Sequence, residues 1–339
     1  MAVTIKDVAL KARVSIASVS RALNGTGTVT SATRERVLRA AQQLRYTPHQ
    51  AARSLITRRT HTIGVLLPDL HGEYFSELIR GIDKAARELG LHLLVSSSHG
   101  DSAEARLALE SMNGRVDGVL IMSSHVDSQL VRGALSAALP AVHMNMPSKA
   151  GDAPTFVTDH FGGARALVRH FVSLGYCRIA HITGPEGNWD AEERLRGYKA
   201  VLAREAHAAE LIVRGDFSEE SGYLAARQLL ALATRPDAVF AGNDMMAIGC
   251  LYAFTEAGLR VPDDIAIGGF DDIPISRYVT PALTTVRAQT TELGRQALGA
   301  LAQAIANAGP GKGQRTVLDT QLVLRDSCHK SAIRGPAVR

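Results

Sequence analysis

The stretch that decides the start of the fold is VTIKDVALKARVSIASVSRALN, residues 3–24. Apolar residues recur in it at three- and four-residue spacing, which predicts an amphipathic helix on each side of a short turn at Arg13 and Val14. Thr4 and Ser15 are candidate caps, because a hydroxyl oxygen can accept from the free N–H groups at a helix start. The expected inward faces are formed by Ile5, Val8, Ala9, Ala12, Val19, Ala22 and Leu23.

Two short helices that cross at small residues form a helix-turn-helix, whose second helix lies in the major groove of DNA. Ala9 and Ala12 are small enough for such a crossing. An amphipathic hairpin that packs only on its own protein is the structural alternative, and the rest of the chain favours DNA binding. The residues expected to face the bases are Ile16, Ala17, Ser20 and Arg21.

Charge is distributed unevenly along the chain, whose formal net charge is +5. Residues 1–60 contain eleven Lys and Arg against two Asp and Glu, so this head carries +9 and the remainder carries −4. A basic head on a mildly acidic body indicates that the head alone binds the phosphate backbone of DNA.

A third helix is expected to begin near Thr30 and to end before Tyr46, with Val37, Ala41 and Leu44 on its inward face. Hydroxyl groups near helix starts can cap the helix, contact phosphates, or do both. The segment PHQAARSL, residues 48–55, could form two helical turns with Pro at the first position. A helix this short is unstable alone in water, so it needs a partner such as DNA and its own copy in a dimer.

Length and composition agree with one small domain and a larger, bilobed one, since the chain has 339 residues and 46% hydrophobic content. The sequence contains no run of about 18 apolar residues, so no membrane span is expected. The N-terminal residues do not show a signal-peptide pattern. Cys177, Cys250 and Cys328 are too widely spaced for a zinc site or a disulfide framework. We therefore expect buried thiols in a reducing cytoplasm, with no metal and no cofactor.

From residue 61 onward, short apolar runs alternate with amphipathic helical stretches. This alternation predicts an α/β body with parallel, doubly wound sheets, and its repetition after about residue 160 indicates two similar lobes. The expected strands lie at 62–67, 92–96, 118–122, 141–145, 178–183, 211–214, 238–241 and 265–269. The expected helices lie near 74–89, 102–114, 161–174, 191–206, 219–234, 244–257 and 291–306.

Ligands of open parallel sheets bind beyond the carboxyl ends of the strands, so the residues just after the expected strands are candidates. Carboxylates and amides bind hydroxyl groups, an arginine donates to oxygens, and an aromatic face stacks on C–H groups, so together they predict a sugar site. Arg194 could instead pair with Glu192 or Glu193 on the surface, although ligand contact is favoured. The residues selected on these grounds are Asp69, Tyr74, Asn188, Trp189, Asp190, Arg194, Asn243 and Asp271.

The motifs T-I-K-D-V-A, A-x-V-S and V-S-R-x-L-N resemble the N-terminal signature of the lactose/galactose-repressor (LacI/GalR) family of bacterial transcription regulators. G-V-L-L-P-D, G-N-D-x-M-A-I-G and L-x-V-P-D-D-I-A-I-x-G-F-D-D extend the resemblance along essentially the whole chain. It implies a periplasmic-binding-protein-like body with a ligand cleft between two lobes and three crossovers. The expected domains are a helix-turn-helix head at 1–47, a hinge helix and linker at 48–60, an effector-binding and dimerisation body at 61–327, and a tail at 328–339.

The resemblance also implies roles for single residues. A leucine at the position of Leu55 wedges into the minor groove, and such a wedge kinks the duplex; the alternative is that Leu55 packs on the body. Residues similar to Arg194, Asn243 and Asp271 contact the effector, and Phe217 resembles the purine-stacking Phe of the purine repressor. The complete set of expected DNA contacts is Thr4, Ser15, Ile16, Ala17, Ser20, Arg21, Asn24, Thr30, Thr33, His49 and Leu55.

The chain departs from the family pattern at several positions. The usual Asn-Pro-Phe-Phe after the first strand reads HGEYF at residues 71–75. The purine repressor has Arg and Thr in place of Asn188 and Asp190, and Trp in place of Met146, which argues against a purine ligand. The base-reading pair Ile16-Ala17 is apolar, and apolar side chains contact thymine methyl groups rather than donor and acceptor edges.

Some candidates have an alternative structural role. Asp244 could cap the helix at 244–257 or contact the ligand, and Asp272 is expected to cap a following turn. Tyr74 is expected to face the cleft, whereas Phe75 is expected to pack in the core.

Two other functional classes compete with a regulator. An enzyme is disfavoured because no dinucleotide-binding loop, G-x-S-x-G or phosphate-binding loop is present and the histidines lack metal spacing. A secreted sugar-binding protein would need a signal peptide and no basic head.

We therefore expect a cytoplasmic repressor of carbohydrate-utilisation genes that a sugar effector releases from its operator. A purine-responsive co-repressor is the alternative. One recognition helix reads too few base pairs, so a homodimer on near-palindromic double-stranded DNA is expected, and the C-terminal tail lacks the leucine heptads of a tetramer-forming zipper.

Overall fold

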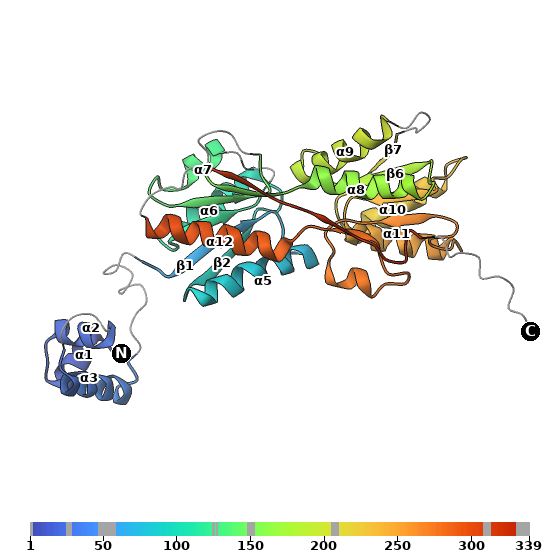
Figure 1. Ribbon diagram of the computed structural model, residues 1–339. Helices are drawn as coiled ribbons and strands as arrows, with labels where there is room; N and C mark the ends of the chain where they lie inside the picture. The colour runs from blue at the N-terminus through green and yellow to red at the C-terminus, as the bar shows by residue number, and fades with distance from the viewer. Residues whose placement is uncertain are drawn as a thin grey trace, which may run out of the picture. The chain divides into compact units, whose positions relative to one another are not determined.

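The computed structural model describes residues 3–24, 29–46, 59–123, 126, 128–147, 153–204, 210–307 and 313–329. The chain divides into two compact units, a head that ends at residue 60 and a body that begins at residue 61 (Figure 1). The expected hinge helix falls on residues 47–58, which lie outside the described residues.

The described residues of the head form three helices, α1 (Ile5–Ala12), α2 (Ile16–Asn24) and α3 (Ser31–Gln43). Small side chains on α1, α2 and α3 let the helices pack closely, which gives the expected helix-turn-helix. The buried residues that make up its core are Val8, Ala9, Ala12, Val19, Ala22, Val37, Ala40 and Ala41.

Local hydrogen bonds fix the helix ends of the head. The hydroxyl oxygen of Ser15 accepts from the backbone N–H of Ser18 at 3.1 Å, and that of Thr30 accepts from Thr33 at 3.4 Å. Ser15 and Thr30 therefore cap their helices, whereas the Thr4 hydroxyl makes no cap bond with the backbone of α1 and instead donates to the Asp7 carboxylate at 2.7 Å. The chain turns at Arg13, whose φ of 54° is in the left-handed region.

The first lobe of the body contains a parallel six-stranded sheet in the order β11-β5-β4-β3-β1-β2. Its strands are β1 (Thr62–Leu67), β2 (His92–Ser97), β3 (Gly118–Ile121), β4 (Ala141–Met144), β5 (Thr155–Thr158) and β11 (Arg315–Leu318). Side chains alternate along β1, so Val65 and Leu67 pack on one face and Leu66 packs on the other. The first face is covered by α5 (Glu73–Glu88) and α12 (Thr290–Ala306), and the second by α6 (Ser102–Met112) and α7 (Ser128–Ala134).

The second lobe repeats this plan on a smaller parallel sheet, in the order β7-β6-β8-β9. Its strands are β6 (Ile179–Thr183), β7 (Leu211–Arg214), β8 (Ala238–Ala241) and β9 (Ala266–Gly268). One face is covered by α8 (His160–Ser173) and α9 (Trp189–Leu202), and the other by α10 (Glu219–Leu230) and α11 (Asp244–Glu256). The two parallel sheets with helices on both faces confirm the predicted fold class.

The chain passes between the lobes three times. It crosses after β5, before α12, and between β11 and β12 (Gln321–Val323), which Figure 1 draws in dark red. Beside these crossings, β12 pairs antiparallel with β10 (Thr285–Arg287), and a short 3₁₀ helix, η1 (Pro274–Arg277), precedes β10.

All eight expected strands of the body are present within one or two residues of their predicted ends. Four further strands, β5, β10, β11 and β12, were not predicted. They are three or four residues long and mix apolar residues with Thr, Arg or Gln. Such runs are too short for a periodicity to stand out, so tertiary pairing, rather than local pattern, makes them strands.

The cysteines only partly follow the expectation. Cys250 and Cys328 are buried, whereas Cys177 is exposed, so the prediction of a buried thiol was wrong there. Cys328 packs in the core of the second lobe beside Tyr176, whose hydroxyl donates to the Cys328 carbonyl at 2.9 Å. Within the part of the chain that the structure describes, we find no helix both long and apolar enough to cross a membrane.

Replacing Gly81 by Ala should destabilise the body, because α5 and α12 touch backbone to backbone at this point. A Cβ on Gly81 would lie 2.2 Å from the carbonyl oxygen of Thr291. Overpacking of this kind costs about 1–3 kcal/mol. Gly299→Ala, on α12 of the same helix pair, is the matched control. Its Cβ would meet nothing within 4 Å, so it should stabilise the body by up to about 1 kcal/mol. Urea unfolding midpoints of both variants check this, and equal shifts would contradict the close approach.

Candidate functional site

A cavity of about 410 Å³ lies between the two lobes of the body. Its walls come from loops that follow the carboxyl ends of strands in both sheets, which is where open parallel sheets bind ligands. The volume is in the range of small-molecule sites. The structure brings all nine predicted effector residues together in its lining: Asp69, Tyr74, Asn188, Trp189, Asp190, Arg194, Phe217, Asn243 and Asp271.

Arg194 is the most firmly held side chain of the site. It is 3% exposed, and its guanidinium lies 4.0 Å from the centroid of the Phe270 ring. Its Nη1 donates to the carbonyl of Gly242 at 2.5 Å and its Nη2 to Oδ1 of Asp271 at 3.1 Å. The alternative of a surface ion pair with a neighbouring glutamate was therefore wrong, because α9 turns this residue inward.

Asp271 follows β9 at a φ of 107°, a left-handed backbone that points its carboxylate at Arg194. Burial raises its pKa to about 7, because the loss of hydration outweighs the attraction of the Arg194 charge, and Asp190 raises it further. The Asp271 carboxyl group therefore changes charge near neutral pH.

His160, which the sequence analysis did not select, links two of the predicted residues. Nε of Arg194 donates to its Nδ1 at 3.3 Å, so Nδ1 carries a lone pair and the proton lies on Nε2. Nε2 is 3.1 Å from Oδ1 of Asp190, a close contact that does not have the geometry of a hydrogen bond. Burial lowers the pKa of His160, which keeps the ring neutral. The ring thus lies between Arg194 and Asp190, on consecutive turns of α9.

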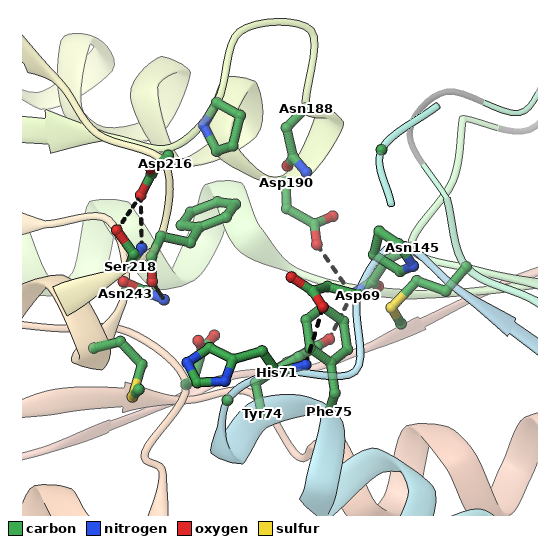
Figure 2. A pocket seen from close by; sticks show the side chains of 18 of the residues that line it. Asp69, His71, Tyr74, Phe75, Asn145, Asn188, Asp190, Asp216, Ser218 and Asn243 are labelled. Carbon is green, nitrogen blue, oxygen red and sulfur yellow. Dashed lines mark hydrogen bonds between the residues drawn. The ribbon is translucent and has the colours of Figure 1, made fainter. Parts of the chain in front are cut away.

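Asn145 connects the two lobes across the cavity, as Figure 2 shows. Its side-chain N–H group donates to the hydroxyl of Tyr74 at 3.1 Å and to Oδ2 of Asp190, on the second lobe, at 3.4 Å. Its oxygen accepts from the backbone N–H of Thr158 at 2.9 Å. The sequence analysis placed Asn145 inside the fourth strand, whereas β4 ends one residue earlier and leaves Asn145 at φ 45°. Its place after a strand end was the signal that could have found it.

Two predicted contacts are also helix caps. The side-chain oxygen of Asn188 accepts from the N–H of Ala191 at 3.0 Å and begins α9. That of Asn243 accepts from Met246 at 3.0 Å and begins α11, while its amide donates to the carbonyl of Phe217 at 3.0 Å. These bonds hold the amide groups at the cavity wall.

The two aspartates with an alternative role turn out to be structural. Asp244 is fully buried, and its carboxylate accepts from the N–H of Ile273 at 2.9 Å and from the hydroxyl of Thr285 at 2.5 Å. It therefore neither caps α11, which Asn243 does, nor lines the cavity. Asp272 was expected to cap a turn, but its main partners are Arg287 at 2.7 Å and Arg325 at 2.5 Å.

Two aromatic residues of the cavity lining also pack against the hydrophobic core. Tyr74 and Phe75 both line the cavity, and both also pack against the core of the first lobe. The expectation that only Tyr74 faces the cleft was incomplete. Trp189 is half-buried, edge-on to His160 at 5.8 Å and 5.7 Å from the Arg315 guanidinium. The lining residues that the sequence analysis did not select include His71, His99, Met122, Asp216, Ser218, Glu219 and Met245.

On the head, the side chains expected to reach DNA lie at or near the surface. Ile16, Ala17 and Arg21 are exposed on α2, and Ser20 is half-buried beside them. The hydroxyl residues at the helix starts, Thr4, Ser15 and Thr30, are exposed, and Thr33 is half-buried. The side chain of Asn24 and the residues His49 and Leu55 lie outside the described residues.

A helix-turn-helix head joined to a bilobed body with an interlobe cavity defines a ligand-responsive DNA-binding regulator. Comparisons with known proteins agree. Residues 4–49 match the family described as "Bacterial regulatory proteins, lacI family". Residues 168–328 match the "Periplasmic binding protein-like domain".

Relatives along the whole chain identify the family. The ribose operon repressor of Escherichia coli (strain K12) is 37% identical over 303 residues, which are 88% of this chain and 92% of that protein. The HTH-type transcriptional repressor PurR of Klebsiella pneumoniae (strain 342) is 37% identical over 310 residues, 90% and 91% of the two chains. A structure of the lac repressor dimer bound to operator and the anti-inducer ONPF is similar with a TM-score of 0.87, at 31% identity over 97% of this chain and 99% of that one. The chain belongs to the LacI family of bacterial regulatory proteins and is a DNA-binding transcriptional regulator, not an enzyme.

Asp271→Asn should change how the stability of the body depends on pH. The folded-state pKa of Asp271 is about 7, against an ordinary value of 3.8. Between these values the folded protein keeps a proton that the unfolded chain releases. Its stabilising effect is therefore full below about pH 4 and is lost as the pH rises toward 7. At about 1.4 kcal/mol per unit of pKa difference, the parent should lose on the order of 3–4 kcal/mol relative to the variant. Urea unfolding from about pH 4.5 to about pH 7.5 measures this, and parallel pH profiles would refute the assignment.

Proposed function

We propose that the chain is a sugar-responsive repressor that acts in the cytoplasm as a homodimer on a near-palindromic operator. Residues 1–47 would bind the half-sites, residues 48–60 would form the hinge with Leu55 as the minor-groove wedge, and residues 61–327 would bind the effector and dimerise. The lac repressor relative is a dimer bound to operator, which supports the assembly.

One observation carries the sugar assignment: carboxylates, amides, a held arginine and aromatic rings line the same interlobe cavity. Hydroxyl groups pair with Asp190 and Asp271, the remaining N–H groups of Arg194 donate to sugar oxygens, and a ring such as Trp189 stacks on a C–H face. The relative named the ribose operon repressor supports a sugar. The features of a purine site are only partly present. Phe217 stands where the purine repressor has its purine-stacking Phe, but Asn188 and Asp190 stand where that repressor has Arg and Thr.

Release of the operator follows from the way the cavity joins the lobes. A ligand shifts a conformational equilibrium only through different affinities for its two states. Asn145, which is also bonded to Tyr74 of the first lobe, donates to Asp190 on the second, so a ligand among them would change how the lobes close. Closure would rotate the first lobes of the dimer relative to each other and separate the hinge segments, which are too short to stay helical alone.

Binding to an operator selected from random duplex DNA should depend steeply on salt. For about 6–10 phosphate contacts, the affinity should fall by about 10³–10⁵ between about 50 and 200 mM salt. Arg21→Ala should cost about 1–3 kcal/mol and relax the preference at one position per half-site if Arg21 makes a bidentate base contact. Arg39→Ala is the matched control, because Arg39 is exposed on α3 and pairs with Glu35. Any effect of Arg39→Ala on binding affinity should be the same for all DNA sequences. Binding that does not depend on salt would refute the assignment of the head as the DNA-binding domain.

Arg194→Ala should abolish the response to ligand and leave operator affinity near that of the parent. The ligand is first found from a panel of free sugars by thermal shift, because a bound ligand stabilises the folded state. In the parent, the ligand should weaken operator binding by about 5–150-fold, the usual range of allosteric coupling. Arg196→Ala, on the same helix but exposed at the surface, should respond like the parent. A full response in Arg194→Ala would refute the site, and tighter operator binding with ligand would make the protein a co-repressor system.

A further inference from the structure

We propose that the cavity selects its ligand by charge. It accepts a free polyhydroxylated molecule that is neutral or positively charged, and it rejects phosphorylated or carboxylate-bearing molecules. The inference rests on the proposed function, because it concerns the ligand of the same cavity, but it makes a separate statement about which chemical class of sugar enters.

The charges on the described residues that line the cavity are strongly unequal. One cation, Arg194, faces five carboxylates. Counting the histidines as neutral, these residues sum to a formal charge of −4 when Asp271 is ionised and −3 when it is protonated. The carboxylates are Asp69, Asp190, Asp216, Glu219 and Asp271.

The single cation is already committed to the protein. Arg194 donates to His160, to the Gly242 carbonyl and to Asp271, and its charge is paired with the Asp271 carboxylate 3.1 Å away. An arginine fork that receives a phosphate needs two parallel N–H groups and an uncompensated charge. Arg194 therefore keeps N–H groups for neutral sugar oxygens but offers no counter-charge for an anion.

The carboxylates, in contrast, keep oxygen atoms for a ligand. Among the described residues, the bonds to Asp69 and to Asp271 use Oδ1 alone. Glu219, the first residue of α10, has no hydrogen-bond or ion-pair partner within the described part of the chain. An ionised carboxylate only accepts hydrogen bonds, so this lining matches donors, namely hydroxyl or ammonium groups.

The negative charges act across the cavity and not only locally. The pKa of Tyr74 lies well above its usual range, chiefly because of burial and then because of the charges of Asp190 and Asp271. Tyr74 belongs to the first lobe and both carboxylates to the second. A ligand between the lobes therefore enters the same field, which low-dielectric walls strengthen.

The aromatic rings of the cavity are compatible with this charge preference. Tyr74, Phe75, Trp189 and Phe217 all line it. An aromatic face stacks on the C–H groups of a neutral sugar and also attracts a cation, whereas it offers nothing to a phosphate.

The field can be measured without knowing the ligand, because Trp189 is the only tryptophan of the chain and lines the cavity. We compare quenching of its fluorescence by caesium and by iodide in the full-length protein, each normalised to a free tryptophan amide. Caesium should quench at least about twice as effectively as iodide, because the five carboxylates of the lining outnumber the two cations near the ring, Arg194 and the Arg315 guanidinium 5.7 Å from it. Equal quenching, or stronger quenching by iodide, would overturn the proposal.

Matched variants place the effect at the cavity. Asp190→Asn and Glu219→Gln should each lower the ratio of caesium to iodide quenching. Glu192→Gln and Glu220→Gln remove the same charge from exposed positions on the same two helices, outside the lining, and should leave the ratio unchanged. Two cavity variants are used so that a folding defect in one of them does not prevent the test. Circular dichroism detects such a defect. A ratio that falls equally in cavity and control variants would refute the assignment.

A ligand series tests selection directly by calorimetry. D-glucose, D-glucosamine and D-glucose 6-phosphate form one set, and D-ribose and D-ribose 5-phosphate form another. Within a set, the phosphate should bind at least about 100-fold more weakly than the free sugar, because like charges in an interface cost several kcal/mol. Tighter binding of a phosphate would overturn the proposal. If no sugar of any charge binds, the sugar assignment fails, and the quenching ratio still decides whether the cavity selects by charge.

Discussion

The body depends on one buried charge, the guanidinium of Arg194. A charge this deep is tolerated only when it is paired and hydrogen-bonded. The structure meets this need with groups from three separate segments: His160 at the start of α8, the carbonyl of Gly242 after β8, and Phe270 and Asp271 after β9, with the guanidinium over the ring of Phe270. Each of these segments begins or ends a different element of the second lobe. The ends of strands that lie far apart in sequence are therefore held to one another by a single side chain.

The same arrangement makes the second lobe sensitive to what enters the cavity. Arg194 is bonded to a neutral His160, which lies 3.1 Å from Asp190, and Asp190 is bonded to Asn145 of the first lobe. Removing water from these groups strengthens their interactions, and leaving any of them unpaired costs free energy. A ligand that takes a hydrogen bond from one member of the series therefore alters the others. The contact between the lobes thus borders the proposed ligand site, which supports the proposal that ligand binding and lobe closure are coupled.

The amount that sequence could predict follows from the range of the interactions involved. Helix caps such as Ser15 and Thr30, and strands such as β1, depend on neighbours within a few residues, so local pattern located them. The rule that ligands lie beyond strand ends placed all nine selected residues on one cavity. His160 and Asn145 were missed because their roles depend on partners 34 and 45 residues away. Asp244 was ambiguous for the same reason: its partners Ile273 and Thr285 come from another part of the chain.

Charge also separates the two binding tasks of the molecule. The head carries +9 and the remainder −4, and the cavity lining concentrates negative charge further. A polyanion such as DNA is attracted to the first and repelled from the second. DNA and effector therefore cannot compete for one surface, and an effect of one on the other must pass through the conformation of the chain. The segregation of charge thus agrees with the proposal that the two lobes change their relation when the cavity is filled, because that change would carry the effect of the effector to the DNA-binding head.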